Sequence, residues 1–170
     1  MKYLYIILIS FFSITLNAQD IFEASRNGNV QELKKLIDSD NEVLNKANSK
    51  GFTPLILATY NNQPEALDYL INEGANVNAQ DFSGNSALMG VCFKGYTKIA
   101  EKLIEHKAEV NQQNFNGATA LIYASTFGHE ELVTLLLQNN ADKKIKDSRG
   151  NTAMSHAVMQ GNNQISALLK

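Results

Sequence analysis

Cysteine, proline and tryptophan are scarce in this chain, and the scarcity of cysteine excludes a class of protein. Its 170 residues include one cysteine, two prolines and no tryptophan. A single thiol cannot form an internal disulfide, so the chain is not a disulfide-stapled scaffold. No histidine or acid is placed beside Cys92 by the sequence, which favours a small packing residue over a redox or nucleophilic one. No internal disulfide therefore stabilises the fold.

Long runs of like charge are also missing. Leaving out Lys2 of the N-terminal segment, 14 basic residues face 17 acidic ones, a net charge of −3. Nucleic-acid binding needs a basic stripe, and attraction to a membrane surface needs a polybasic cluster. Neither is visible in the sequence. We therefore expect no nucleic-acid partner and no membrane insertion of the chain once its N-terminal segment is removed.

The sequence also lacks a recognisable catalytic, metal or cofactor site. Its three histidines fall at unrelated positions, whereas metal ligands converge at short fixed spacings. Ser155 and His156 are adjacent, but neighbours on a helix point in different directions. Acid pairs such as Glu130-Glu131 occupy helix starts, where they complement the helix dipole. There is no glycine-rich phosphate loop. We expect no catalytic, cofactor-binding or metal-binding residues, and structural or solvated roles for His106, His129 and His156.

Glycine, by contrast, recurs with a fixed period. Gly51, Gly84, Gly117 and Gly150 are each separated by 33 residues. A period of this length indicates stacked structural repeats, because such a unit cannot bury its apolar face alone. The period divides the chain into units at about residues 20–50, 51–83, 84–116, 117–149 and 150–170.

Each unit is predicted to contain two short helices followed by an extended turn. Hydroxyl residues stand where they can cap each first helix, and glycine or asparagine stands where it ends. The second helix carries an apolar stripe of period 3.6, such as Leu132, Leu136 and Leu137. The caps are Thr53, Ser86, Thr119 and Thr152, and the helix ends are Gly28, Asn62, Gly95, Gly128 and Gly161. Polar residues in the last unit suggest a terminal cap that faces water.

These motifs resemble the ankyrin-repeat family over about residues 20–170. The resemblance is carried by Thr53-Pro54-Leu55, by Gly128-His129-Glu130-Glu131-Leu132-Val133 and by Gly74-Ala75-Asn76-Val77-Asn78. It implies an all-α repeat solenoid of about five units, two of them caps. One departure is the loss of the family's histidine in T-P-L-H, where this chain has Ile56, Met89, Ile122 and Ser155. That loss removes local turn hydrogen bonds.

The first 18 residues have the layout of a signal peptide. Lys2 supplies a positive charge, residues 3–16 are almost wholly apolar, and Asn17-Ala18-Gln19 offers a small-residue exit. The apolar run of 14 residues is shorter than the roughly 20 that span a bilayer. We expect cleavage after Ala18 and a periplasmic or secreted protein of a bacterial type, with residues 19–170 as the repeat domain. An uncleaved membrane anchor is the alternative.

The resemblance also implies a contact surface at the hairpin tips and first-helix ends. Aromatic residues gather at these sites and are predicted to be exposed, which is typical of interaction surfaces. They are Phe52, Phe82, Phe115, Tyr60, Phe93 and Phe127, with Arg26, Lys94 and Arg149 predicted as a charged rim. Phe82 and Phe115 could instead stack along neighbouring tips and stiffen the scaffold.

The function that follows is a non-enzymatic protein–protein interaction module, exported to the cell envelope as a monomer. The partner is another protein. The same layout is compatible with an accessory or immunity-type protein that supports or inhibits one enzyme or toxin. A self-assembling structural scaffold and an enzyme with a cleft between repeats are further alternatives.

Overall fold

The computed structural model describes residues 21–170, and the predicted signal segment lies outside them. The chain forms two compact units divided between Asn76 and Val77. Within the described range the regular structure is helical, apart from an isolated antiparallel bridge between Gln80 and Ser86. The predicted all-α repeat fold is confirmed.

The N-terminal unit, residues 21–76 of the described chain, contains two helix pairs. Residues 21–27 are helical and precede α2 (Val30–Ser39) and the 3₁₀ helix η1 (Asn41–Asn45). The second pair is α3 (Pro54–Tyr60) and α4 (Pro64–Asn72). The predicted apolar stripes form its core, in which Leu33, Leu67 and Leu70 are fully buried.

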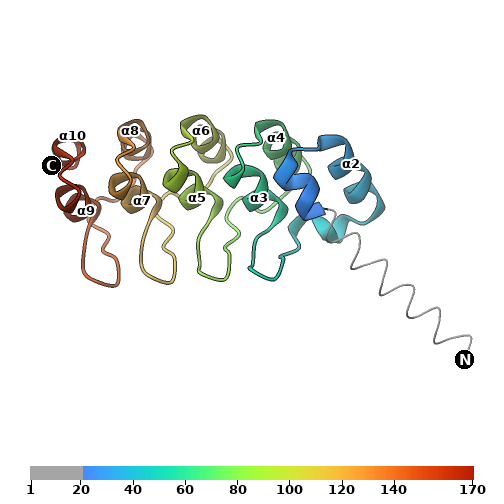
Figure 1. Ribbon diagram of the computed structural model, residues 1–170, viewed down its shortest axis with the longest axis horizontal. Coiled ribbons are helices and arrows are strands. Elements are labelled where there is room, and N and C mark those ends of the chain that lie inside the picture. The colour runs from blue at the N-terminus through green and yellow to red at the C-terminus, as the bar shows by residue number, and fades with distance from the viewer. Residues whose placement is uncertain (1–20) are drawn as a thin grey trace, which may run out of the picture. The chain divides into compact units, whose positions relative to one another are not determined.

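The C-terminal unit, residues 77–170, contains three helix pairs. They are α5 (Ala87–Lys94) with α6 (Thr97–Glu105), α7 (Ala120–Thr126) with α8 (Glu130–Gln138), and α9 (Ala153–Met159) with α10 (Asn163–Leu168). Within this unit α5, α7 and α9 pack side by side in one row, and α6, α8 and α10 form a second row (Figure 1).

The predicted helix boundaries are confirmed by their hydrogen bonds and dihedral angles. Each predicted cap accepts the backbone N–H three residues on, as Thr119 does from Ile122. Left-handed residues with φ between 56° and 93° follow the first helix of every pair and the second helices α4, α6 and α8, which satisfies their last carbonyl groups, whereas α2 ends at the extended residue Asp40. These left-handed residues are Gly28, Asn62, Gly74, Gly95, Lys107, Gly128, Asn140 and Gly161.

Three polar hairpins of the C-terminal unit, here called fingers, precede its first helices (Figure 1). The first finger is residues 77–86, the second 110–119 and the third 143–152. Backbone bonds join neighbouring fingers, from Phe115 N–H to the Ser83 carbonyl at 3.1 Å and from Ser148 N–H to the Asn116 carbonyl at 2.8 Å. Gln113 adds a side-chain bond from Nε2 to the Lys146 carbonyl at 3.3 Å. The fingers are thus held together in a hydrogen-bonded row.

The last helix pair is less polar on its surface than the sequence predicts. Val158 and Met159 are 61% and 63% exposed, although many of their neighbours are polar. Val158 occupies the repeat position of Cys92 and Ser125, which are fully buried in α5 and α7.

No helix within residues 21–170 is both long and apolar enough to cross a bilayer.

Candidate binding surface

An exposed aromatic cluster lies where α5 and α7 end. It consists of Phe93, Tyr123 and Phe127. The Phe93 and Phe127 rings meet edge to face with centroids 4.6 Å apart, and Tyr123 stacks on Phe127 at 6.5 Å. Phe93 remains 37% exposed and Phe127 47% exposed. The contacts between the rings fix their orientations, while a substantial part of the apolar area of Phe93 and Phe127 is exposed to solvent.

Tyr123 is anchored from beneath by the first and second fingers. Its hydroxyl donates to Asn85 Oδ1 at 3.1 Å and accepts from Asn114 Nδ2 at 3.1 Å. Asn114, which is buried, also donates to Asn85 Oδ1 at 2.8 Å. Burial raises the pKa of the Tyr123 hydroxyl, with a further increase from Asp81, although the Asn114 bond lowers it. The phenol therefore stays protonated and holds its ring in place.

Beside the cluster, the second and third fingers border an open hollow of about 300 Å³. Ile122, Tyr123, Thr126 and Phe127 supply one wall from α7. Asp147, Ser148 and Arg149 supply another from the third finger, and His156 lines it from α9. The hollow therefore combines an apolar wall with a polar, charged rim.

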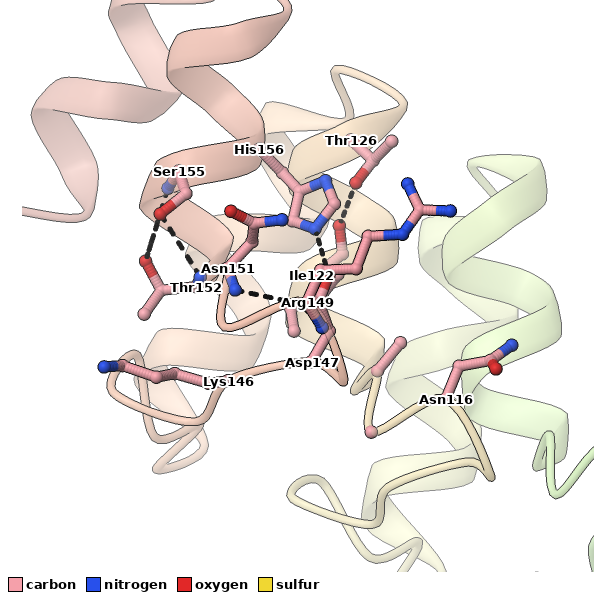
Figure 2. Close-up of polar contacts among 12 residues, drawn as sticks. Asn116, Ile122, Thr126, Lys146, Asp147, Arg149, Asn151, Thr152, Ser155 and His156 are labelled. Carbon is pink, nitrogen blue, oxygen red and sulfur yellow. Dashed lines mark hydrogen bonds and ion pairs between the residues drawn. The ribbon is translucent and has the colours of Figure 1, made fainter.

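Asp147 fixes the shape of the third finger. Its Oδ1 accepts the backbone N–H groups of Arg149 and Asn151 at 2.9 Å each, and its Oδ2 lies 2.8 Å from His156 Nε2 (Figure 2). Burial alone would raise the pKa of this carboxyl, but the bonds from Asn151, His156 and Arg149 together lower it. Both carboxylate oxygens of Asp147 are thus already engaged, one by the backbone of the third finger and the other by His156 of α9.

Arg149 supplies a basic group to the rim of the hollow. Its side chain runs from the third finger toward Thr126 at the end of α7, whereas that of Lys146 points to the other side of the finger (Figure 2). In the part of the chain that the structure describes, the Arg149 guanidinium makes no ion pair. The third finger carries four basic residues and one acidic residue, while the second finger carries neither.

The structure divides the residues predicted to bind a partner. Phe93, Phe127, Lys94 and Arg149 lie exposed in the C-terminal unit. Tyr60 and Arg26 are exposed in the N-terminal unit, so the prediction that all these residues share one contact surface stays a prediction.

The tip phenylalanines differ from one another. Phe82 and Phe115 are exposed as predicted, but Phe52 is half-buried, so the prediction that it is exposed is wrong. Phe52 N–H is held by Asn48 Oδ1 at 3.1 Å, which fixes this residue in its loop. Phe115 lies against Gly84, so a Cβ added there would sit 2.8 Å from its Cδ1. Phe115 thus packs on the neighbouring finger, as the stiffening role requires, and still presents a face to solvent.

The histidines and Ser155 make structural contacts. His129 Nε2 lies 3.3 Å from the Phe93 carbonyl, which agrees with the structural role predicted for it. Ser155 forms a reciprocal cap with Thr152, so its hydroxyl is engaged at the start of α9. Cys92 is fully buried, in keeping with the predicted packing residue, and burial raises the pKa of its thiol. Across residues 21–170 no cluster of acids, histidines or cysteine could hold a metal ion.

Two elements of this surface are missed by reasoning from the sequence. Tyr123 and His156 share one repeat position, and each bonds to the finger residue nine positions earlier, Asn114 and Asp147. Tyr123 follows Ile122 and His156 follows Ser155, the residues that stand where the family has the histidine of T-P-L-H. A polar side chain recurring there is the signal that could have indicated a bond to the finger.

Comparisons with known proteins match most of the chain to one family. The family model described as Ankyrin repeats (3 copies) matches residues 21–114 and 88–170. Over 81 residues, 47% of this chain, it is 37% identical to Ankyrin repeat and SAM domain-containing protein 6 of Rattus norvegicus, and covers 9% of that protein. Over 89 residues, 52% of this chain, it is 30% identical to Ankyrin repeat family A protein 2 of Bos taurus, covering 28%.

A third relative has an enzyme's name. Over 62 residues, 36% of this chain, the sequence is 39% identical to Palmitoyltransferase akr1 of Emericella nidulans, and covers 8% of that protein. The chain spans less than a third of the length of each of these three relatives. The likeness is therefore confined to a small part of each.

Proposed function

We propose that this chain, which belongs to the ankyrin-repeat family, is a non-enzymatic module that binds another protein through its C-terminal unit. Ankyrin repeats generally mediate protein–protein interaction. Stacked repeats expose a continuous surface whose variable positions suit recognition of a macromolecule. The bound surface would be the aromatic cluster with the adjoining hollow.

The single observation that supports this proposal is the exposure of the aromatic cluster. Phe93 and Phe127 could have been covered by the next repeat or replaced by polar residues, yet both keep a large part of their area in water. Exposing apolar rings is unfavourable in an isolated protein, and contiguous apolar patches usually mark interaction sites. Rings already locked by Tyr123 lose little conformational entropy when a partner covers them.

Partner capture by the full chain, tagged at its C-terminus, tests this proposal. We expect one envelope protein to co-purify, and the double substitution Phe93→Ala and Phe127→Ala to remove it from the bound fraction. Truncating hot-spot aromatics costs about 2 kcal/mol or more of binding free energy, enough to lower the captured amount of partner strongly. Unchanged recovery of the partner by the double variant, with an unchanged circular dichroism spectrum, would contradict the proposal.

We also propose export of the mature chain to the periplasm or the medium. The support is the charged, apolar and small-residue order of residues 1–18. Mass spectrometry of the protein from producing cells should find a chain that begins at Gln19. Recovery of intact chain starting at Met1 in the membrane fraction would instead indicate an uncleaved anchor.

The finer roles are distinguished by what happens to the captured protein. An accessory or immunity-type role predicts that the partner is an enzyme or toxin whose activity changes on binding. A self-assembling scaffold predicts a mass that rises with concentration in light scattering. A cleft enzyme predicts turnover abolished by a single histidine or acid substitution.

A further inference from the structure

The hollow beside the aromatic cluster limits the chemistry of the segment it can hold. One wall, from α7, presents Ile122, Tyr123 and Phe127. Their side chains offer apolar surface and ring faces, which gain free energy when an apolar side chain covers them. At about 300 Å³ the hollow is at the small end of ligand pockets, which suits one or two side chains.

The charges at its rim are not balanced. Asp147 has a negative charge, but its two oxygens already accept two backbone N–H groups and face His156. Arg149 has no such internal partner within residues 21–170. The third finger also carries Lys143, Lys144 and Lys146, so its net charge is positive. An acidic group is therefore the complement that this rim favours.

We propose that the hollow binds a segment of a protein partner in which an apolar side chain stands next to a carboxylate. The apolar side chain covers Tyr123 and Phe127, and the carboxylate pairs with the Arg149 guanidinium. The planar guanidinium can bond both carboxylate oxygens, which adds geometric selectivity to the charge attraction. This inference rests on the proposed binding function and names the chemistry of the partner's contact segment.

Charge and apolar contact can be separated with three blocked tripeptides, Glu-Phe-Glu, Gln-Phe-Gln and Glu-Ala-Glu. The ¹⁵N-labelled full chain is titrated with each, and amide shifts are followed by NMR. We expect Glu-Phe-Glu to move the amides of Phe127, Ser148 and Arg149. Gln-Phe-Gln should bind at least about fivefold more weakly, as expected for loss of a charge-assisted pair. Glu-Ala-Glu should also bind more weakly, because it lacks the ring.

Lys146 provides the matched control for Arg149. Both are basic residues of the third finger, but only Arg149 lines the hollow, and the two side chains point in different directions (Figure 2). Arg149→Gln should abolish the preference for Glu-Phe-Glu over Gln-Phe-Gln, while Lys146→Gln should leave most of it. Phe127→Ala should weaken both phenylalanine peptides. The amide spectrum of each variant reports whether it is folded.

Three results would overturn the inference. They are equal affinity for Glu-Phe-Glu and Gln-Phe-Gln, an equal effect of Arg149→Gln and Lys146→Gln, and no shift at the finger amides with any peptide at its solubility limit. In each case the proposed protein-binding function still stands if the substitutions Phe93→Ala and Phe127→Ala abolish partner capture. It fails separately if they do not.

Discussion

At the scale of single residues, one acid or amide determines the shape of each finger and of the equivalent loop before α3. Asn48, Asp81, Asn114 and Asp147 each accept the N–H groups two and four residues on. An amide oxygen serves as well as a carboxylate, which explains why both types occur. Asp147 differs because its second oxygen also bonds His156.

The charge of Asp147 makes stability depend on pH in one direction. Its folded pKa is lowered, so the unfolded chain binds its proton more readily. The stabilisation is present above the ordinary aspartate pKa of about 3.9 and is lost as pH falls through the lower folded value. Asp147→Asn should cost less than about 1 kcal/mol at neutral pH, since Asn48 and Asn114 show that the backbone bonds survive.

Urea unfolding of the wild type and Asp147→Asn between pH 3 and pH 7 measures this contribution. The variant should lose less stability than the wild type as the solution is acidified. Asp147→Ala is the matched control, because it removes the backbone bonds too and should cost about 1–2 kcal/mol at neutral pH. An identical acid slope for the wild type and Asp147→Asn would show that the negative charge of Asp147 contributes nothing to stability.

At the scale of elements, the fingers are stiffened by packing at their glycines. Gly84 and Gly150 have nearly the same backbone angle, φ 79° and 80°. A Cβ on Gly84 would lie 2.8 Å from both Phe115 N and Phe115 Cδ1, whereas a Cβ on Gly150 would meet nothing within 4 Å. Alanine at Gly150 therefore tests backbone strain alone, whereas alanine at Gly84 tests the same strain together with the contact between fingers.

Alanine at these two glycines should have unequal effects on stability. Gly150→Ala should lower the free energy of unfolding by about 1–2 kcal/mol, the cost of placing alanine in a left-handed conformation. Gly84→Ala adds a clash with the backbone of the second finger, so its cost should exceed that of Gly150→Ala by about 1 kcal/mol or more. Denaturant unfolding gives both values. Equal costs would mean that the second finger moves aside freely and that Phe115 does not stiffen the row.

The features that sequence reasoning predicted are those with local causes. A threonine cap, a left-handed glycine and an apolar stripe each act within a few residues, so the repeat register places them correctly. The Tyr123–Asn85 bond joins residues 38 apart, and it depends on how one finger lies against the next repeat.

At the scale of the whole molecule, each compact unit has its own packed core, and the aromatic cluster and hollow belong to the C-terminal one. Negative net charge and a basic third finger coexist in the chain, so its charge is unevenly distributed. Uneven charge affects which partners approach and in what orientation, while apolar contact supplies most of the affinity. The proposed function depends on the apolar contact for affinity and on the uneven charge for the choice and orientation of the partner.

The affinity of the captured partner for three forms of the chain tests the central claim most directly. They are the wild type, the double variant Phe93→Ala and Phe127→Ala, and Leu168→Ala as a control. Leu168 is 39% exposed, close to the 37% of Phe93, but it lies on α10 outside the cluster. By isothermal titration calorimetry, we predict that the double variant binds at least about thirtyfold more weakly, the equivalent of 2 kcal/mol, while Leu168→Ala binds like the wild type. Equal affinity for all three folded proteins would contradict binding through the aromatic cluster.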